Sequence, residues 1–235
     1  MRGQRAAAAV IAGLLLALPL RAEDPEEKGG RRLDACREVL VEVLGMPESI
    51  PRDLLDKAEC VIVIPSVKKA ALVVGARWGK GAASCRKKVG RSGWSAPLMM
   101  SVGGGSVGFQ VGGQAADYVL LVMNPRGMES LLKSKFTLGA DASVAGGPKG
   151  RTASAATDAW MRAEILSYTR SRGLFAGVSI EGMVINRDDD TNEAVYGEPV
   201  SARKVLLEER YEVPASARAF IDALSEYSPG PHPDR

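Results

Sequence analysis

The stretch MMSVGGGSVGFQVGGQAA, residues 99–116, decides how the rest of the sequence is interpreted. It is too apolar for a linker and too rich in glycine for a helix, and it runs directly into the apolar segment 118–123. Glycine inside a strand weakens the strand unless another backbone approaches closely or the sheet bends sharply. We therefore expect a strongly coiled antiparallel sheet at the centre of the protein.

Apolar side chains recur with a period of two on both sides of this stretch, which predicts further strands. These first strands are 61–64, 70–77, 79–87, 94–102, 105–113 and 118–123. Residues 90–93 favour a hairpin turn, and 137–145 predict a strand with one buried face. A long hairpin is expected to follow, formed by 165–170 and 174–185.

Helices are expected at both ends of the chain. Residues 33–44 carry apolar side chains at helical spacing, and Ser49 as N-cap with Pro51 in the first turn predicts a second, short helix. Residues 127–133 also favour a helix.

At the C-terminal end, Ser201 is expected to cap a helix over 202–207, and Pro214 opens a last amphipathic segment. The predicted fold class is α+β. Its many-stranded, glycine-rich antiparallel sheet is strongly coiled or barrel-like, with helices at the N- and C-terminal ends.

Residues 1–22 have the organisation of an export signal peptide. Arg2 and Arg5 precede the apolar core 6–18, and Leu20-Arg21-Ala22 offers a small-residue cleavage site. A retained membrane anchor is less favoured, because a spanning helix needs roughly 20 apolar residues. The segment holds three arginines and no acid, so its removal brings the 31 basic residues level with the 28 acidic ones. We therefore expect an exported protein, periplasmic or secreted, without a nucleic-acid partner.

The remainder divides into a flexible linker over 23–32, a single domain over 33–227 and a disordered tail over 228–235. Its three cysteines, Cys36, Cys60 and Cys85, leave at least one thiol unpaired within the chain, and buried inert thiols are the favoured interpretation. No Cys-x-x-Cys occurs, so we expect no structural zinc site. We also predict no other metal site and no cofactor.

Two catalytic patterns match within the glycine-rich stretch, and both lack the context they need. Gly103-x-Gly105-x-x-Gly108 fits a dinucleotide fingerprint and Gly104-x-Ser106-x-Gly108 a nucleophile elbow, but no helix start follows either. The sole histidine, His232, lies between prolines in the expected tail, which argues against histidine-assisted nucleophilic catalysis.

Isolated acidic residues add little to an enzymatic interpretation. Residues 188–192 begin like a calcium loop but lack its later glycine and glutamate, so a solvated hairpin turn is expected. Glu181 is an acid in a predicted strand, either buried and paired or simply exposed. An enzyme centred on Glu181 or Asp141 ranks last among the functions considered.

The distribution of basic residues is the strongest clue to a partner. No acid occurs between Val61 and Ala116, whereas eight cations and two tryptophans do. Such a set would form a positive patch for an anionic membrane surface, with tryptophan as an interfacial anchor. The alternative is a solvated set of strand edges. The candidate lipid-binding residues are Lys68, Lys69, Arg77, Trp78, Lys80, Arg86, Lys87, Lys88, Arg91 and Trp94.

Several motifs in a fixed order resemble one known family, the SYLF domain, over roughly residues 33–226. They are Gly93-Trp94-Ser95-Ala96-Pro97, the glycines of 103–113, Asp117 before its apolar strand, Leu138-Gly139-Ala140-Asp141, residues 145–151, residues 167–182 and Thr191-Asn192 with Tyr196-Gly197.

The resemblance implies a lipid-binding module without catalytic activity. Eukaryotic members of the family bind phosphoinositides, and yeast relatives bind actin filaments. Those members begin with a lysine-rich amphipathic helix, whereas residues 31–44 here carry mixed charges. With an export signal, the chain resembles an exported bacterial member, for which cytosolic actin is an unexpected partner. An envelope structural or protein-interaction module without lipid specificity is the alternative.

Overall fold

The structure, a computed structural model, describes residues 24–71, 74–87, 93–107, 112–150, 160, 162–171 and 173–229. The predicted export signal and the greater part of the predicted turn at 90–93 therefore lie outside the described residues, as do Lys88 and Arg91.

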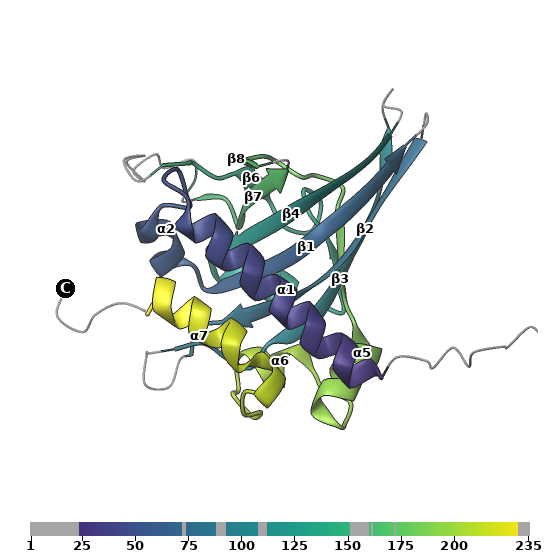
Figure 1. Cartoon of the computed structure of the whole chain (residues 1–235), viewed down its shortest axis with the longest axis vertical. Coiled ribbons are helices and arrows are strands. Elements are labelled where there is room, and N and C mark those ends of the chain that lie inside the picture. The colour runs from purple at the N-terminus through teal and green to yellow at the C-terminus, as the bar shows by residue number, and fades with distance from the viewer. Residues whose placement is uncertain are drawn as a thin grey trace, which may run out of the picture.

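A nine-stranded sheet forms the centre, in the order β5-β9-β3-β2-β1-β4-β7-β6, with β8 paired to β7. It curls into a half-barrel, which confirms the predicted fold class (Figure 1). All strand pairs are antiparallel except β6 with β7. The strands are β1 (Cys60–Ala71), β2 (Val74–Cys85), β3 (Leu98–Val107), β4 (Gly112–Val122), β5 (Lys135–Thr137), β6 (Val144–Gly146), β7 (Ile165–Ser171), β8 (Leu174–Gly177) and β9 (Val184–Arg187).

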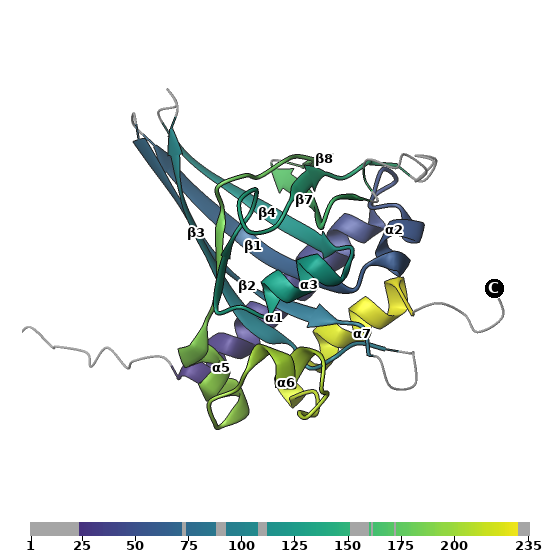
Figure 2. The ribbon, with the colours of Figure 1, turned by 180° about the vertical axis from the view of Figure 1, so that it is seen from behind.

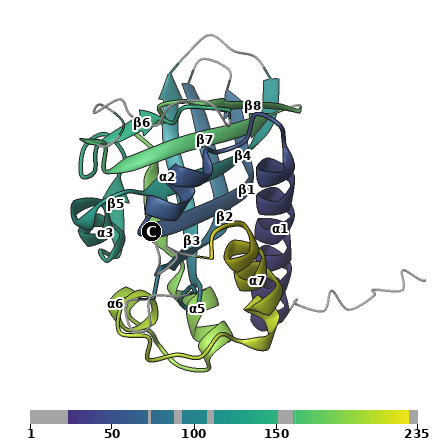
Figure 3. The ribbon, with the colours of Figure 1, turned by 90° about the vertical axis from the view of Figure 1, so that its left-hand side faces the viewer.

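Helices cover both faces of this sheet (Figures 2 and 3). Helices α1 (Pro25–Gly45), α2 (Arg52–Lys57) and α7 (Arg218–Tyr227), the last after the short 3-10 turn Ala215–Ala217, bury side chains in one apolar core. Helices α3 (Pro125–Leu131) and α6 (Ala202–Leu206) pack into a second core on the opposite face. Helix α5 (Asp189–Tyr196) lies against α1 and β3. No helix within the described ranges is both long and apolar enough to cross a bilayer.

Helix α1 begins well before its expected start at Leu33. The Asp24 side chain accepts a hydrogen bond from the Glu26 backbone at 3.0 Å, and Pro25 occupies the first turn. Proline and an acidic cap are both favoured at a helix start. The expected linker over 23–32 is therefore helical from Pro25 onward.

An extra residue in β1 changes which of its side chains face α1. Registers with both neighbouring strands shift across Pro65 and Ser66, which form a β-bulge in which Ser66 has φ +48°. The Ser66 backbone N–H donates to Asp117 Oδ1 at 2.8 Å. Val61 and Val63 pack in the core beneath α1, and beyond the bulge Lys68 takes over this side of the strand.

Within the glycine-rich stretch, backbones approach closely at Gly104, where an added Cβ would lie 3.1 Å from the Gly182 carbonyl oxygen, but nothing lies within 4 Å at Gly105. The tightest approach between β1 and β2 lies outside that stretch. A Cβ added at Gly81 would lie 2.0 Å from the Val63 carbonyl oxygen, so β1 and β2 could not coil this tightly with a side chain there. The predicted strand over 105–113 is wrong in part, because β3 ends at Val107 and β4 begins at Gly112.

Several downstream predictions also need correction. The strand predicted over 137–145 is interrupted after Thr137 by a turn in which Gly139 has φ +85°. The hairpin of β7 and β8 is confirmed, but β8 ends at Gly177 and the chain turns again at Gly182, φ +76°. Strand β9 then pairs with β3 and β5 instead.

Two predicted caps and turns differ as well. Residues 188–192 do not form a hairpin turn: Asp188 is the N-cap of α5, and its side chain accepts from the Thr191 backbone. Ser49 does not cap α2, since Pro51 occupies that position, and Ser49 is buried. Ser201 does cap α6 as predicted.

The cysteines and the C-terminal end complete the picture. Cys60 and Cys85 face each other across β1 and β2 and form a disulfide, so the prediction of buried thiols holds for Cys36 alone. Ser228, expected in a disordered tail, is buried. Its backbone oxygen accepts from Trp94 Nε1 at 3.1 Å.

Candidate functional site

A shallow basic groove lies between the N-terminal half of α1 and the bulged part of β1 with β2. Its volume is about 410 Å³. Cationic side chains come from both sides of it, and an indole forms part of its wall. It is lined by Lys28, Arg31, Arg32, Ala35, Pro65, Ser66, Lys68, Trp78, Gly79 and Lys80.

The sheet side of the groove follows from strand register. Lys68 on β1 lies directly opposite Trp78 on β2, so both project from the same face, and Lys80 follows two residues later. The Trp78 side chain is 49% exposed, which makes it one of three large apolar residues exposed within the described chain. An exposed indole beside two ammonium groups offers both an apolar and a cationic contact.

The helix side follows from helical spacing. Lys28, Arg31, Arg32 and Ala35 are separated by three and four residues, so they share one flank of α1. The opposite flank buries Leu33 and other apolar residues against the sheet. The packed helix thus presents its charges, rather than its apolar face, to the groove.

Acidic side chains compensate part of this charge. Asp188 Oδ2 lies 2.8 Å from Arg32 Nη1 and 3.3 Å from Lys80 Nζ, and Arg31 pairs with Glu27 at 3.0 Å. Burial by itself would raise the pKa of Asp188, but the charges and hydrogen bonds of Arg32 and Lys80 lower it below its ordinary value. No ion pair reaches Lys68 from the described part of the chain.

The structure places the candidate lipid-binding residues that it describes in different parts of the molecule. Only Lys68, Trp78 and Lys80 line the groove. Lys69 and Arg77 also face each other across β1 and β2, but strand alternation turns them to the other face of the sheet. The ten predicted residues therefore do not form one patch, since adjacent strand residues project in opposite directions.

Arg86 and Trp94 have structural roles at the far end of these strands. The Arg86 guanidinium lies 4.5 Å from the Trp94 ring centre and donates to the carbonyl oxygens of Leu55 and Ala58. Trp94 is only 1% exposed and cannot serve as the surface anchor expected of it. Lys87 follows β2 at this same end, away from the groove.

Sequence reasoning missed Lys28, Arg31 and Arg32, because the segment was interpreted as linker and as a helix of mixed charge. The spacing of three and four residues was the available signal. Their meeting with Lys68 and Lys80 depends on how α1 crosses the sheet, which periodicity does not specify.

The acidic residues considered for catalysis do not form a site of comparable extent among the described residues. Glu181 is exposed rather than buried, and Asp141 Oδ2 accepts from the Thr137 backbone at 2.7 Å in a turn. No group of three or more metal-ligating side chains occurs among the described residues. A second surface has apolar character: Leu174 on β8 is 78% exposed and Val178 is 42% exposed.

Fold and groove together define an α+β domain built on a curled sheet, with a basic groove under its N-terminal helix. Residues 103–227 match the family described as "Ysc84: Las17-binding protein actin regulator". The chain belongs to this family, the Ysc84 or SYLF family.

Similar proteins occur in fungi and animals. An SH3 domain-containing protein of Schizosaccharomyces pombe is 33% identical over 91% of this chain and 49% of its own length. LAS seventeen-binding protein 3 of Saccharomyces cerevisiae is 34% identical over 70% of this chain and 36% of its own length. The human SH3 domain-containing YSC84-like protein 1 is 32% identical over 78% of this chain and 53% of its own length. The chain thus spans about half or less of these relatives.

Proposed function

We propose that this domain is a non-enzymatic binding module that contacts anionic phospholipid, of the phosphoinositide type, through the basic groove. The observation that carries the proposal is the convergence of five cations and a half-exposed tryptophan on one groove. Near an anionic membrane each well-placed lysine or arginine contributes about 1 kcal/mol. An indole at the lipid interface adds an amphipathic contact.

The proposal includes export to the periplasm or the exterior. Its support is the signal-like sequence of residues 1–22 together with the disulfide between Cys60 and Cys85, since disulfides persist mainly in oxidising compartments. Under this proposal cytosolic actin is not the expected partner. Fractionation of the native host and the mass of the recovered protein test it, and an intact N-terminus in the cytosol would contradict it.

Vesicle co-sedimentation tests lipid binding. We expect the protein to pellet with vesicles of phosphatidylcholine that contain about one fifth anionic phospholipid, and to remain soluble with phosphatidylcholine alone. Because screening shortens electrostatic range from about 10 Å at 0.1 M salt to about 3 Å at 1 M, binding should fall as salt rises. Binding that ignores both lipid charge and salt would overturn the proposal.

Matched variants locate the contact. Lys68→Glu and Trp78→Ala should each weaken vesicle binding several-fold, since both side chains face the groove and are exposed. Lys204→Glu, exposed on α6 outside the groove, makes the same charge change and serves as the control. Equal effects of Lys68→Glu and Lys204→Glu would indicate a net-charge effect instead of a site.

The alternative function is protein interaction in the envelope without lipid specificity. The exposed pair Leu174 and Val178 favours it, as does the family description, which names binding to Las17 and regulation of actin. It predicts that Leu174→Ser abolishes partner capture while vesicle binding is unchanged. Loss of capture with Lys68→Glu alone would count against it.

A further inference from the structure

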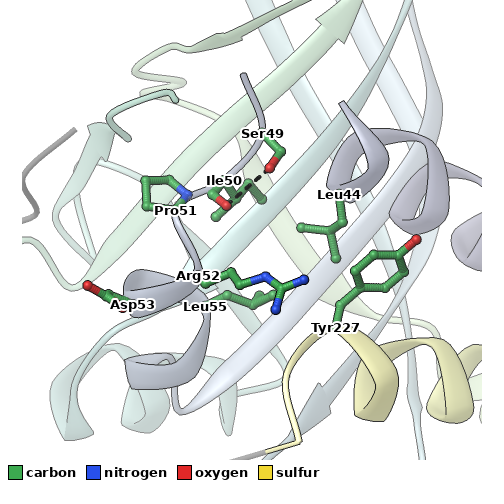
Figure 4. Close-up of a pocket in the computed structure, with 8 residues that line it drawn as sticks. All are labelled: Leu44, Ser49, Ile50, Pro51, Arg52, Asp53, Leu55 and Tyr227. Carbon is green, nitrogen blue, oxygen red and sulfur yellow. Dashed lines mark hydrogen bonds between the residues drawn. The ribbon is translucent and has the colours of Figure 1, made fainter. Parts of the chain in front are cut away.

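A second cavity lies at the other end of α1, remote from the basic groove, where α2 and the C-terminal end of α7 meet it (Figures 1 and 4). Its volume is about 230 Å³. This is below the about 300–1,000 Å³ typical of sites for drug-sized ligands, so any occupant is small. Its lining residues are Leu44, Ser49, Ile50, Pro51, Arg52, Asp53, Leu55 and Tyr227.

The cavity has an apolar floor. Leu44, Ile50 and Leu55 are buried core residues that line it, and the ring of Tyr227 stands across from them (Figure 4). An occupant therefore gains free energy by burying an aliphatic or aromatic body. The Ser49 hydroxyl already donates to the Ile50 carbonyl oxygen, at 3.4 Å, and so adds little polarity.

One charged group turns into this cavity. The Arg52 guanidinium points toward Leu44 and Tyr227, whereas the Asp53 carboxylate points away (Figure 4). No ion pair reaches Arg52 from the residues that the structure describes. A guanidinium fork matches a carboxylate in charge and in geometry. A dianionic phosphate would need a second cation, and the cavity lining contains none besides Arg52.

From this arrangement we propose that the cavity binds a small monocarboxylate with an apolar body, its carboxylate on Arg52 and its chain between Ile50, Leu55 and Tyr227. The site is separate from the basic groove and does not depend on the lipid-binding proposal. Loss of one can be observed with the other intact.

Calorimetric titration of the full-length protein with three probes of equal chain length tests the charge preference. Octanoate should bind, octanol should bind about tenfold or more weakly, and octylamine should not bind measurably, since a charge-assisted hydrogen bond distinguishes the three. Equal binding of octanol and octanoate would reduce the site to an apolar hole and overturn the proposal. Absence of octanoate binding at millimolar concentration would also overturn it.

Variants assign the charge to Arg52. Arg52→Gln should lower octanoate affinity about tenfold or more while octanol affinity is unchanged, and Arg52→Lys should give an intermediate value. Asp53→Asn should leave octanoate binding unchanged or stronger. Arg203→Gln, an exposed arginine on α6, is the control. Arg52 is itself exposed, so these variants should fold, and unchanged octanoate binding by folded Arg52→Gln would refute the assignment.

Discussion

At the scale of single residues, the absence of a side chain at Gly81 is a requirement of the coiled sheet. Gly81→Ala would place a methyl group 2.0 Å from the Val63 oxygen, a backbone atom that cannot move independently. Overpacking of this kind costs about 3 kcal/mol or more. Gly105→Ala is the matched control, because nothing lies within 4 Å of a Cβ built there. Urea unfolding should separate the two variants clearly, and equal stabilities would contradict this account of the sheet.

Asp188 shows how a residue can hold the groove together while limiting its charge. Asp188→Asn keeps an N-cap for α5 but leaves Arg32, 8% exposed, without its carboxylate. We expect a loss of about 2–3 kcal/mol, less than for a fully buried pair because Lys80 still reaches water. The same variant should bind anionic vesicles more tightly. Weaker vesicle binding by a folded variant would mean that Asp188 supports the site only structurally.

The same carboxylate gives a defined dependence of stability on pH. Its pKa in the folded protein lies below the ordinary value of 3.8, so the charged form stabilises the fold at pH values above that. This contribution is lost as the pH falls below about 4 through the folded-state pKa. Urea titrations between about pH 6 and pH 3 should show the loss in the wild type, and Asp188→Asn should show less of it. Parallel pH profiles for both proteins would contradict the expectation.

At the scale of elements, the disulfide joins the first residue of β1 to the last residue of β2. Closure of the 25-residue separation between Cys60 and Cys85 should stabilise the protein by about 3–4 kcal/mol. The double variant Cys60→Ala with Cys85→Ala should therefore unfold at lower urea. Adding reductant should destabilise the wild type by a similar amount and leave the double variant unaffected. An effect of reductant on the double variant would point to another cause.

The elements also show what a sequence can and cannot specify. Period-two alternation located β7, and cap residues located α6, because these depend on neighbours in the sequence. The alternation found β1 and β2 only in part: it predicted strands over 61–64, 70–77 and 79–87, whereas the two strands run over Cys60–Ala71 and Val74–Cys85. The start of α1 was missed although Asp24 and Pro25 supplied a local signal. Other features depend on distant partners: β9 pairs with β3 rather than extending β8, and the disulfide requires the register of β1 with β2.

The candidate site likewise combines residues that the local sequence indicates with contacts that only tertiary packing creates. Three of its residues could be identified from an acid-free basic stretch, namely Lys68, Trp78 and Lys80. The stretch could not show that Lys69 projects to the other face or that Trp94 is buried, because both follow from tertiary packing. The pairing of Arg32 with Asp188 joins two segments that lie far apart in the sequence, and no local pattern specifies it.

At the scale of the whole molecule, Cys36 reports whether the fold stays intact on a membrane. This thiol lies in α1, is buried, and has its pKa raised to about 12 by burial. We expect it to resist maleimide labelling both in solution and on anionic vesicles, since α1 packs its apolar face into the core. Labelling in urea is the positive control. Rapid labelling on vesicles but not in solution would show that α1 leaves the sheet to enter lipid. That result would contradict binding through a groove in which α1 stays packed on the sheet.

The bulge at Pro65 and Ser66 determines how the protein should respond to the deletion of single residues from β1. A strictly alternating strand of this sequence would direct Val67 toward α1 and Lys68 inward; the surplus residue reverses that parity halfway along one strand. Excision of Ser66 would remove the surplus and leave both halves facing as they do now. Excision of Ile62, four positions earlier, would turn Cys60 and Val61 to opposite faces of the strand, so each would enter the other's core and Cys60 would point away from Cys85. Two mutations of identical size should thus differ sharply in soluble yield.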